Sequence, residues 1–318
     1  MRLAVSLLTY KRPEGLARLL EALNALIFHG SVPEIDIVVV DNDPLAGARA
    51  ACELWRRTSR WPLLYIVEPQ PGIAPARNAA LDNVGGVDFI CFVDDDEVPE
   101  PGWLAELIRV QTRYDADVVG GPVVPYFPQS VPDWVLRGCF FRRRRHPTGT
   151  RLSHAFTNNV LFRKGILDEM GLRFDGRWAL AGCEDRHFFQ RIGMSGYKIV
   201  WADEAIVTEW VPAERATARW LIRRHYRVGN STSLIESDLQ SRWTIRLLLA
   251  CKGLAWLVIG SGLLATSSFL GKRGLVRALR ACAYGAGLLT GLLGIRFEEY
   301  RRVAQATEHP QEKQNPVR

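Results

Sequence analysis

Two features that place chains in common functional classes are absent from this 318-residue sequence. Its six cysteines include no Cys-x-x-Cys pair and no metal-type spacing, so we expect reduced core or loop thiols in a cytosolic compartment. The apolar run at residues 3–8 is too short for the core of a secretory signal, and it leads directly into a charged turn. We therefore expect neither a disulfide framework nor a secretory signal.

A glycine-rich phosphate loop is missing as well. Dinucleotide-binding oxidoreductases carry G-x-G-x-x-G directly after the first strand, but residues 8–13 here are Leu-Thr-Tyr-Lys-Arg-Pro. Without such a loop, bound phosphates need another source of positive charge, and a metal ion held by carboxylates can supply it. The sequence therefore favours a metal-bridged diphosphate over a dinucleotide cradled by a helix.

Positive charge is concentrated towards the C-terminus. Residues 242–318 hold 12 Lys and Arg against 4 Asp and Glu, whereas residues 1–241 hold 29 against 30, within a net charge of +7. A basic tail on a nearly neutral remainder predicts an anionic surface as partner and argues against nucleic acid bound in a groove of the domain.

Short apolar runs alternate with helical patterns along the first third of the chain. The predicted strands are residues 3–8, 35–40, 63–67 and 89–93, and predicted helices begin at Pro13, Gly72 and Pro99. Such alternation predicts an α/β fold with a parallel, doubly wound sheet.

Polar residues follow several of these strands. Thr9 and Asp41 each end a strand, and Asp94, Asp95 and Asp96 follow the fourth. Because open α/β sheets bind ligands at the carboxyl ends of their strands, these side chains should border a nucleotide-sized pocket. Adjacent carboxylates there suit a hard cation such as Mg²⁺ or Mn²⁺. A solvated acidic turn or a helix N-terminus is the alternative.

Six motifs in a fixed order carry a more specific signal. They are Val5-Ser-Leu-Leu-Thr-Tyr-Lys-Arg-Pro13, Val38-Val-Val-Asp-Asn-Asp43, Gly72-Ile-Ala-Pro-Ala-Arg-Asn78, Val93-Asp-Asp-Asp96, Asn158-Asn159 and Gly182-Cys-Glu-Asp-Arg186. Together they resemble the inverting family 2 glycosyltransferases of the GT-A fold, and in pattern the bacterial exopolysaccharide glycosyltransferases of the succinoglycan type. The similarity covers about residues 2–230.

This resemblance implies both a fold and an activity. It implies a GT-A nucleotide-diphospho-sugar transferase domain, with a mostly parallel, Rossmann-like sheet, over residues 1–230. The activity it implies is inverting transfer of a hexose from a nucleotide-diphosphate sugar to a glycan or lipid-linked saccharide acceptor in bacterial surface or exopolysaccharide synthesis. Polymerising relatives carry a Gln-x-x-Arg-Trp signature that is missing here, so we expect transfer of a single sugar.

The resemblance also implies roles for individual residues. Those expected to bind the nucleotide sugar are Thr9, Tyr10, Arg12, Asp41, Arg77, Asp94 and Asp95. Asp94 and Asp96 are expected to hold Mg²⁺ or Mn²⁺, with Glu209 in place of the histidine that many GT-A enzymes use. Asp95 should point away from its neighbours if the chain stays extended. Trp178 and Asn159 are the expected acceptor-binding residues.

Inversion requires one carboxylate base opposite the leaving group. The family pattern makes Asp185 this base and Glu184 a positioning residue. Both precede a predicted helix over residues 186–194, whose N-terminus favours the ionised form of a carboxyl group. The alternative is that the two acids only cap this helix.

The C-terminal region, residues 231–318, is predicted to be a helical membrane-association segment with a polar tail. Residues 253–271 carry no charge, residues 281–295 form a shorter apolar run, and four positive charges lie between them. Two full spans would place those charges outside, against the positive-inside tendency. We therefore expect a hairpin in the inner leaflet, at the cytoplasmic face of the inner membrane, bound to anionic lipids. Two full spans and a buried helical pair are the alternatives.

Two rival functions share part of this pattern. A nucleotidyltransferase uses strand-end carboxylates but needs no base at Glu184-Asp185. A non-catalytic membrane scaffold of a polysaccharide assembly complex would keep the fold without the chemistry, and it would have no use for Asp94, Asp96 and Asp185 together.

Overall fold

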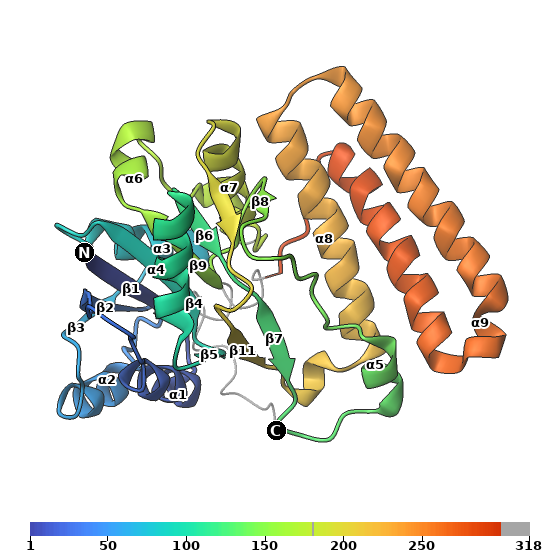
Figure 1. The fold of residues 1–318 in the computed structure, drawn as a ribbon. Coiled ribbons are helices and arrows are strands. Elements are labelled where there is room, and N and C mark those ends of the chain that lie inside the picture. Colours follow the sequence, from blue (N-terminus) through green and yellow to red (C-terminus); the bar gives the residue numbers. More distant parts are fainter. Residues whose placement is uncertain (180, 300–318) are drawn as a thin grey trace, which may run out of the picture. The chain divides into compact units, whose positions relative to one another are not determined.

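The computed structural model describes residues 1–179 and 181–299, apart from the side chain of Ser268. These residues belong to two compact units (Figure 1). Unit 1 comprises Met1–Val124 and Arg143–Trp210, and unit 2 comprises Pro125–Arg142 and Val211–Glu299. The predicted polar tail, residues 300–318, lies outside the described residues.

Unit 1 is built on an eight-stranded sheet with the order β3-β2-β1-β4-β9-β6-β10-β8. Its strands are β1 Arg2–Thr9, β2 Glu34–Asp41, β3 Leu63–Val67, β4 Phe89–Asp94, β6 Val118–Gly120, β8 Arg151–Leu152, β9 Asn159–Arg163 and β10 Ile199–Trp201. Strands β3, β2, β1 and β4 pair in parallel, as predicted. Strand β9 runs antiparallel to both β4 and β6. The mostly parallel α/β architecture is therefore confirmed, with an antiparallel insertion that the strand pattern did not reveal.

A second sheet contains three strands in the order β5-β11-β7. They are β5 Glu97–Pro99, β11 Val207–Trp210 and β7 Val123–Tyr126. We expected a helix to begin at Pro99, and this was wrong. Pro99 pairs with Val207, and the next N–H, that of Glu100, donates to the Ile206 carbonyl, so the strand continues and helix α4 starts only at Trp103.

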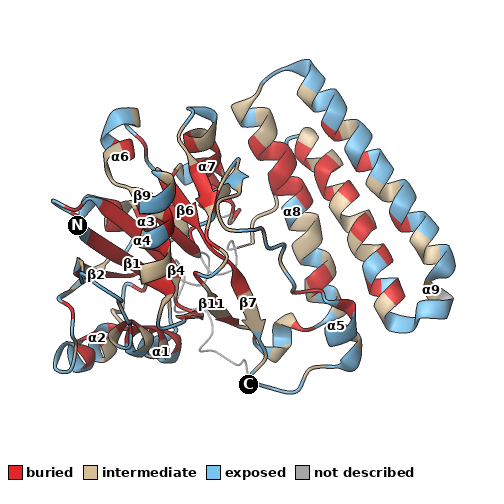
Figure 2. Cartoon of the chain, in the orientation of Figure 1, coloured by how far each residue is buried: buried red, intermediate tan, exposed pale blue. Residues whose placement is uncertain are grey.

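Helices cover both faces of the large sheet (Figure 2). The helices of unit 1 are α1 Pro13–Asn24, α2 Arg49–Arg56, α3 Ile73–Asp82, α4 Trp103–Tyr114, α6 Gly165–Met170 and α7 Glu184–Met194, with the 3-10 helix η1 Gly176–Trp178. Alternate residues of β1 point to opposite faces. Val5 and Leu7 pack with the leucines of α1, whereas Ala4 packs with side chains of α3 and α7.

Unit 2 is mainly helical. It contains α5 Asp133–Gly138, the 3-10 helix η2 Ala213–Arg215, α8 Ala218–Leu239 and α9 Trp243–Leu292. Helix α9 is broken at Gly271, where φ is 57° and ψ is −152°, into a first arm (residues 243–270) and a second arm (residues 272–292). We had placed the basic stretch 271–280 between two apolar runs. This order along the chain holds, and the stretch is helical: after the break at Gly271 it forms the start of the second arm.

The helices of unit 2 approach one another through glycine. A side-chain carbon on Gly260 of the first arm would lie 3.0 Å from the Ala278 carbonyl oxygen of the second arm. One on Gly291 of the second arm would lie 2.6 Å from the Asn230 carbonyl oxygen of α8. Such contacts between backbones, made possible by small residues, are typical of helices that pack in membranes.

The compact units do not follow the expected boundary at residue 230. Residues 211–230 belong to unit 2 together with α9, since α8 packs along α9, and residues 125–142 also join that unit. The assignment of membrane association to residues 231–318 stays a prediction.

Candidate active site

The carboxyl ends of β1, β2 and β4 meet at one edge of the sheet, as predicted. Thr9 is the register partner of Asp41, and Leu8 is the register partner of Asp94. The loops that follow these strands therefore start side by side. The chain places its conspicuous acidic run at this edge.

The acidic run turns its side chains in different directions. Asp95 is buried and accepts hydrogen bonds from Thr9 Oγ1 at 2.9 Å and from Arg12 Nη1 at 3.0 Å. The same Arg12 nitrogen lies 3.2 Å from Asp96 Oδ2. Burial raises the pKa of Asp95, and the charge of Arg12 opposes that shift. Asp94 instead faces Arg77. The expectation that Asp95 points away from its neighbours therefore holds for Asp94 but not for Asp96, since Asp95 and Asp96 share the same Arg12 nitrogen.

Arg77 links the two groups of acids. It is buried on α3, whose N-cap, Gly72, has a φ of 123° that favours glycine. The Arg77 guanidinium forms an ion pair with Glu184, and its Nη2 lies 3.7 Å from Asp94 Oδ1. One buried cation therefore holds the start of α7 beside the acidic turn.

The charges around Asp94 are closely coupled. Its pKa is raised to about 7, first by burial, against the opposing charge of Arg77, and then by Asp96, Asp95 and Asp185. The Asp94 side chain is still 42% exposed, so solvent moderates this effect. Burial and three neighbouring carboxylates thus act on Asp94 in the same direction, and Arg77 opposes them.

The two acids of α7 differ in environment. Glu184 is buried, and burial raises its pKa, against the opposing charge of Arg77. Asp185 is partly exposed, and its Oδ1 accepts a hydrogen bond from the Arg186 backbone N–H at 2.6 Å. Both lie in the first helical turn, where the helix dipole favours an ionised carboxylate. Asp185 therefore has the accessibility that a base requires, and Glu184 does not.

Glu97 was missed in the sequence. It is buried and accepts hydrogen bonds from the Asp94 backbone N–H at 3.2 Å and from Asn158 Nδ2 at 3.1 Å. Burial, followed by the charges of Asp94 and Asp96, raises its pKa well above the usual range. Because Glu97 follows three aspartates, it reads in the sequence as one more residue of a solvent-exposed acidic run. The available signal was its place in a strand-like Glu-Val-Pro segment.

Two side chains that were expected to bind the nucleotide, those of Asp41 and Thr9, form hydrogen bonds within the protein. Asp41 is 0% exposed, and its oxygens accept bonds from the Asp43 and Ala48 backbone N–H groups and from Tyr65 Oη. Thr9 is also buried, and it donates to Asp95. Both side chains are thus buried and hydrogen-bonded within the protein, and their assignment as nucleobase contacts stays a prediction. Tyr10 is partly exposed, with the Lys11 ammonium 5.0 Å from its ring centre.

Both expected acceptor-binding residues are interior. Trp178 is 1% exposed, and its ring lies against His187 at 5.4 Å between centroids. Asn159 is buried and bonds Trp103 Nε1 through its oxygen and two backbone carbonyls through its nitrogen. In this structure both side chains serve packing and strand closure, and their assignment to acceptor binding stays a prediction.

Glu209 was expected to complete a metal site, and the structure places it differently. It is buried and forms an ion pair with Arg143 at 2.7 Å, opposite Glu97 in the β5–β11 register. Within residues 1–179 and 181–299, no three His, Cys, Asp or Glu side chains gather closely enough to hold a metal ion. Any metal site here would therefore use Asp94 and Asp96 with oxygens from the substrate or solvent.

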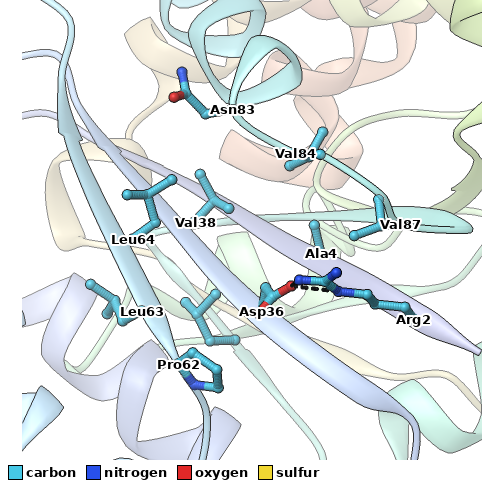
Figure 3. Close-up of a pocket in the computed structure, with 12 residues that line it drawn as sticks. Arg2, Ala4, Asp36, Val38, Pro62, Leu63, Leu64, Asn83, Val84 and Val87 are labelled. Atoms are coloured by element: carbon cyan, nitrogen blue, oxygen red, sulfur yellow. Dashed lines mark hydrogen bonds and ion pairs between the residues drawn. The ribbon is translucent and has the colours of Figure 1, made fainter.

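A hollow of about 290 Å³ lies elsewhere on unit 1 (Figure 3). It is lined by residues near the amino ends of β1 and β2, including Arg2 and Asp36, which are ion-paired at 2.9 Å. Because the acidic turn follows the carboxyl ends of these strands, this hollow is not part of the candidate active site.

Solved structures share this fold. A mannosyltransferase from Pyrobaculum calidifontis, PcManGT, in complex with GDP-Man and Mn²⁺ aligns with a TM-score of 0.61 at 19% identity, over 92% of this chain and 87% of that one. S. aureus TarS 1-349 in complex with UDP aligns with a TM-score of 0.52 at 16% identity, over 94% and 93%. The fold is the GT-A fold of glycosyltransferases.

Sequence comparison narrows this class to a family. The Glycosyl transferase family 2 profile matches residues 5–171, and that of Glycosyl transferase family group 2 matches residues 89–295. The chain is 33% identical over 312 residues to Succinoglycan biosynthesis protein ExoM of Rhizobium meliloti (strain 1021), covering 94% of this chain and 96% of that protein. It is 22% identical over 251 residues to Glycosyltransferase AglE of Haloferax volcanii, covering 79% and 78%. The chain belongs to glycosyl transferase family 2 and is a glycosyltransferase.

Proposed function

We propose that this glycosyltransferase transfers a single hexose, with inversion, from a nucleotide-diphosphate sugar to a glycan or lipid-linked saccharide in bacterial surface or exopolysaccharide synthesis. The observation that carries the proposal is the Arg77 link, which holds the Glu184-Asp185 pair beside Asp94. Asp185 accepts the proton of the attacking acceptor hydroxyl, whose oxygen bonds to the anomeric carbon as the bond to the diphosphate breaks. The name of ExoM supports the polysaccharide pathway, and the UDP and GDP-Man complexes support the donor class.

A divalent cation fits the acidic turn. Asp94 and Asp96 offer partly exposed carboxylate oxygens, the ligand type that Mg²⁺ and Mn²⁺ prefer. The raised pKa of Asp94, caused by burial and by neighbouring carboxylates, marks a local excess of negative charge that a cation would relieve. When bound, the ion neutralises negative charge on the leaving nucleoside diphosphate. Each carboxylate has a different arginine beside it, with Arg12 Nη1 3.2 Å from Asp96 Oδ2 and Arg77 Nη2 3.7 Å from Asp94 Oδ1.

The reaction class can be tested with the full chain and a panel of nucleotide sugars in Mn²⁺. Release of the nucleoside diphosphate from one sugar donor is the expected result. A nucleotidyltransferase would instead consume a nucleoside triphosphate and release pyrophosphate. A scaffold protein would release neither product, and either of these outcomes contradicts the proposal.

We also propose that unit 2 lies on the membrane without crossing it. Within the described part of the chain, one segment, Trp243–Ser267, is long and apolar enough to span, with a mean hydropathy of 1.9. Gly260, in its second half, packs against Ala278 and Cys282 of the second arm. A span would therefore draw Arg280 towards the bilayer centre, where a charged residue costs about 2.5–3.5 kcal/mol on insertion scales.

Adsorption in the plane of the membrane gives both the apolar and the basic residues of unit 2 a favourable environment. The first arm carries a row of exposed apolar side chains, here called the apolar stripe: Trp243, Leu247, Leu254, Val258 and Phe269. Figure 2 shows exposed positions along α9. An exposed row of this length is unusual for a surface in contact with water only. The basic residues of unit 2 would lie among anionic headgroups, each contributing about 1 kcal/mol. This supports the cytoplasmic face of the inner membrane as the location.

The apolar stripe can be tested by substitution. Val258 and Phe269 are 73% and 90% exposed, so replacing both with serine should leave the fold intact. Burying such side chains contributes about 1.5–3 kcal/mol each, so the double variant should bind neutral phosphatidylcholine vesicles about 100-fold more weakly in flotation assays. Leu45→Ser, at an 84% exposed site of unit 1, is the matched control and should bind normally. Equal binding by the double variant would contradict the in-plane placement.

A further inference from the structure

Unit 2 contains a cation without an acidic partner. Arg280 of the second arm is half-buried, and no carboxylate within residues 1–179 and 181–299 lies within 4.0 Å of its guanidinium. Arginine side chains that leave water are normally paired with an anion. Arg277, one turn earlier, adds a second positive charge beside it. Arg280 and Arg277 therefore need a counter-ion, and the described part of the protein does not supply one.

Arg280 is held in one orientation by two neutral groups. Its Nη2 lies 2.6 Å from His225 Nε2, and its guanidinium carbon lies 4.6 Å from the centre of the Phe140 ring. His225 Nδ1 lies 3.1 Å from the Leu221 carbonyl oxygen, so Nδ1 is the donor and Nε2 accepts from Arg280. The guanidinium is thus fixed before any ligand arrives.

His225 does not compete for an anion as a second cation. Burial, followed by the charges of Arg280 and Arg224, lowers its pKa to about 4, so the ring is neutral at physiological pH. Burial and the charge of Arg277 lower the pKa of Arg280 to about 10, which still leaves it charged. The group Arg280, Arg277 and His225, called here the Arg280 cluster, is therefore strongly positive and has hydrogen-bond donors left on Nη1.

Lys272 is a further cation that lies over an aromatic ring, as Arg280 does. Lys272 lies on the same side of the second arm as Arg280, two turns earlier, with its ammonium 5.1 Å from the Trp134 ring centre. The Trp134 and Phe140 rings contact each other edge to face, with centroids 5.7 Å apart. Val276, between the two cations, is buried in the same cluster as Phe140. The Trp134 and Phe140 rings thus support a row of positive charge along the second arm.

We propose that the Arg280 cluster binds the phosphate group of a membrane lipid. A planar guanidinium with free N–H donors matches two phosphate oxygens at once. The second arm packs directly against the first arm, which carries the apolar stripe, so a phosphate attached to an apolar chain suits this setting. The proposal rests on the membrane association proposed above and is independent of the catalytic residues.

The test compares full-length variants on vesicles of equal charge. Phosphatidylcholine vesicles contain either phosphatidic acid, whose phosphate monoester is accessible, or phosphatidylserine, with the surface charge matched. Wild type should bind the phosphatidic acid vesicles about tenfold more tightly, as one or two charge-assisted hydrogen bonds would provide. Arg280→Gln should abolish this preference, and Arg280→Lys should restore it only in part, because lysine keeps the charge without the fork. Thermal unfolding of Arg280→Gln should match wild type.

Arg273→Gln is the matched control. It removes the same charge from the same helix at a position without the His225 and Phe140 contacts, so it should weaken binding to both vesicles equally. Equal effects of Arg273→Gln and Arg280→Gln on the lipid preference would overturn the site in favour of diffuse attraction. Wild type binding both vesicles alike would overturn it too. Wild type binding neither vesicle would overturn the membrane association and this proposal together.

A final arm separates lipid phosphate from soluble phosphate. Isothermal titration of the full chain with inorganic phosphate and with pyrophosphate should show binding at least about tenfold weaker than to phosphatidic acid vesicles. Arg280-dependent binding of either soluble anion at the strength seen with vesicles would overturn the lipid assignment and define a site for a free anion.

Discussion

Asp185→Asn should lower kcat by about 10²–10⁴-fold, the usual contribution of a general base, while the Kd for the nucleotide-sugar donor stays unchanged. Asparagine keeps the size of the side chain and its place in the first turn of α7, and it loses the negative charge and the ability to accept a proton. Donor affinity is measured by isothermal titration, and kcat by release of nucleoside diphosphate in the presence of acceptor.

The matched control for this variant is Asp168→Asn. Asp168 is an exposed acid near the start of α6, with an ion pair to Lys164 at 2.8 Å on the surface. Such a pair contributes little, so turnover should be unchanged. A loss of donor affinity in Asp185→Asn comparable to its loss of kcat would make Asp185 a binding or structural residue.

Asp96→Asn should reduce metal-dependent turnover by about 10²–10³-fold, because the loss of one anionic ligand removes several kcal/mol of charge stabilisation. In Mn²⁺ the variant should also bind nucleoside diphosphate more weakly than wild type does. In EDTA the two proteins should bind it equally. Asp96 is partly exposed and pairs with the half-exposed Arg12, so the fold should survive.

Asp82→Asn is the matched control, because it removes a carboxylate that lies outside the proposed metal site. Asp82 lies at the end of α3 and forms an exposed ion pair with Arg173 at 3.1 Å. It should have full activity and the same Mn²⁺ dependence as wild type. Near-normal turnover in Asp96→Asn would show that the metal assignment is wrong.

Much of the fold was predictable because it depends on local pattern. The strand over residues 63–67 was predicted to the residue, since a short apolar run beside polar turns has one stable placement in a parallel sheet. Pro13 begins α1, where a missing N–H costs nothing. Strand β9 was harder, because its antiparallel direction is set by partners distant in the chain and leaves no local mark.

The site was predictable where strand ends determine position and unpredictable where burial does. The Asp94–Asp96 run lies at the expected sheet edge. The burial of Trp178 and Asn159 was not predictable, because an aromatic ring and an amide suit a sugar-binding surface or an interior equally well, and only packing distinguishes these. Arg77 carried no sign in the sequence that its partner would be Glu184.

Arg77 and Glu184 are separated by 107 residues. At a synthesis rate of about 5–20 residues per second, Arg77 is added to the chain roughly 5–20 s before Glu184. During that interval the acidic turn exists without the helix that carries Asp185. A half-synthesised chain therefore lacks the carboxylate that we propose as the base. On the proposed mechanism, the catalytic step therefore requires the second half of the domain to have folded.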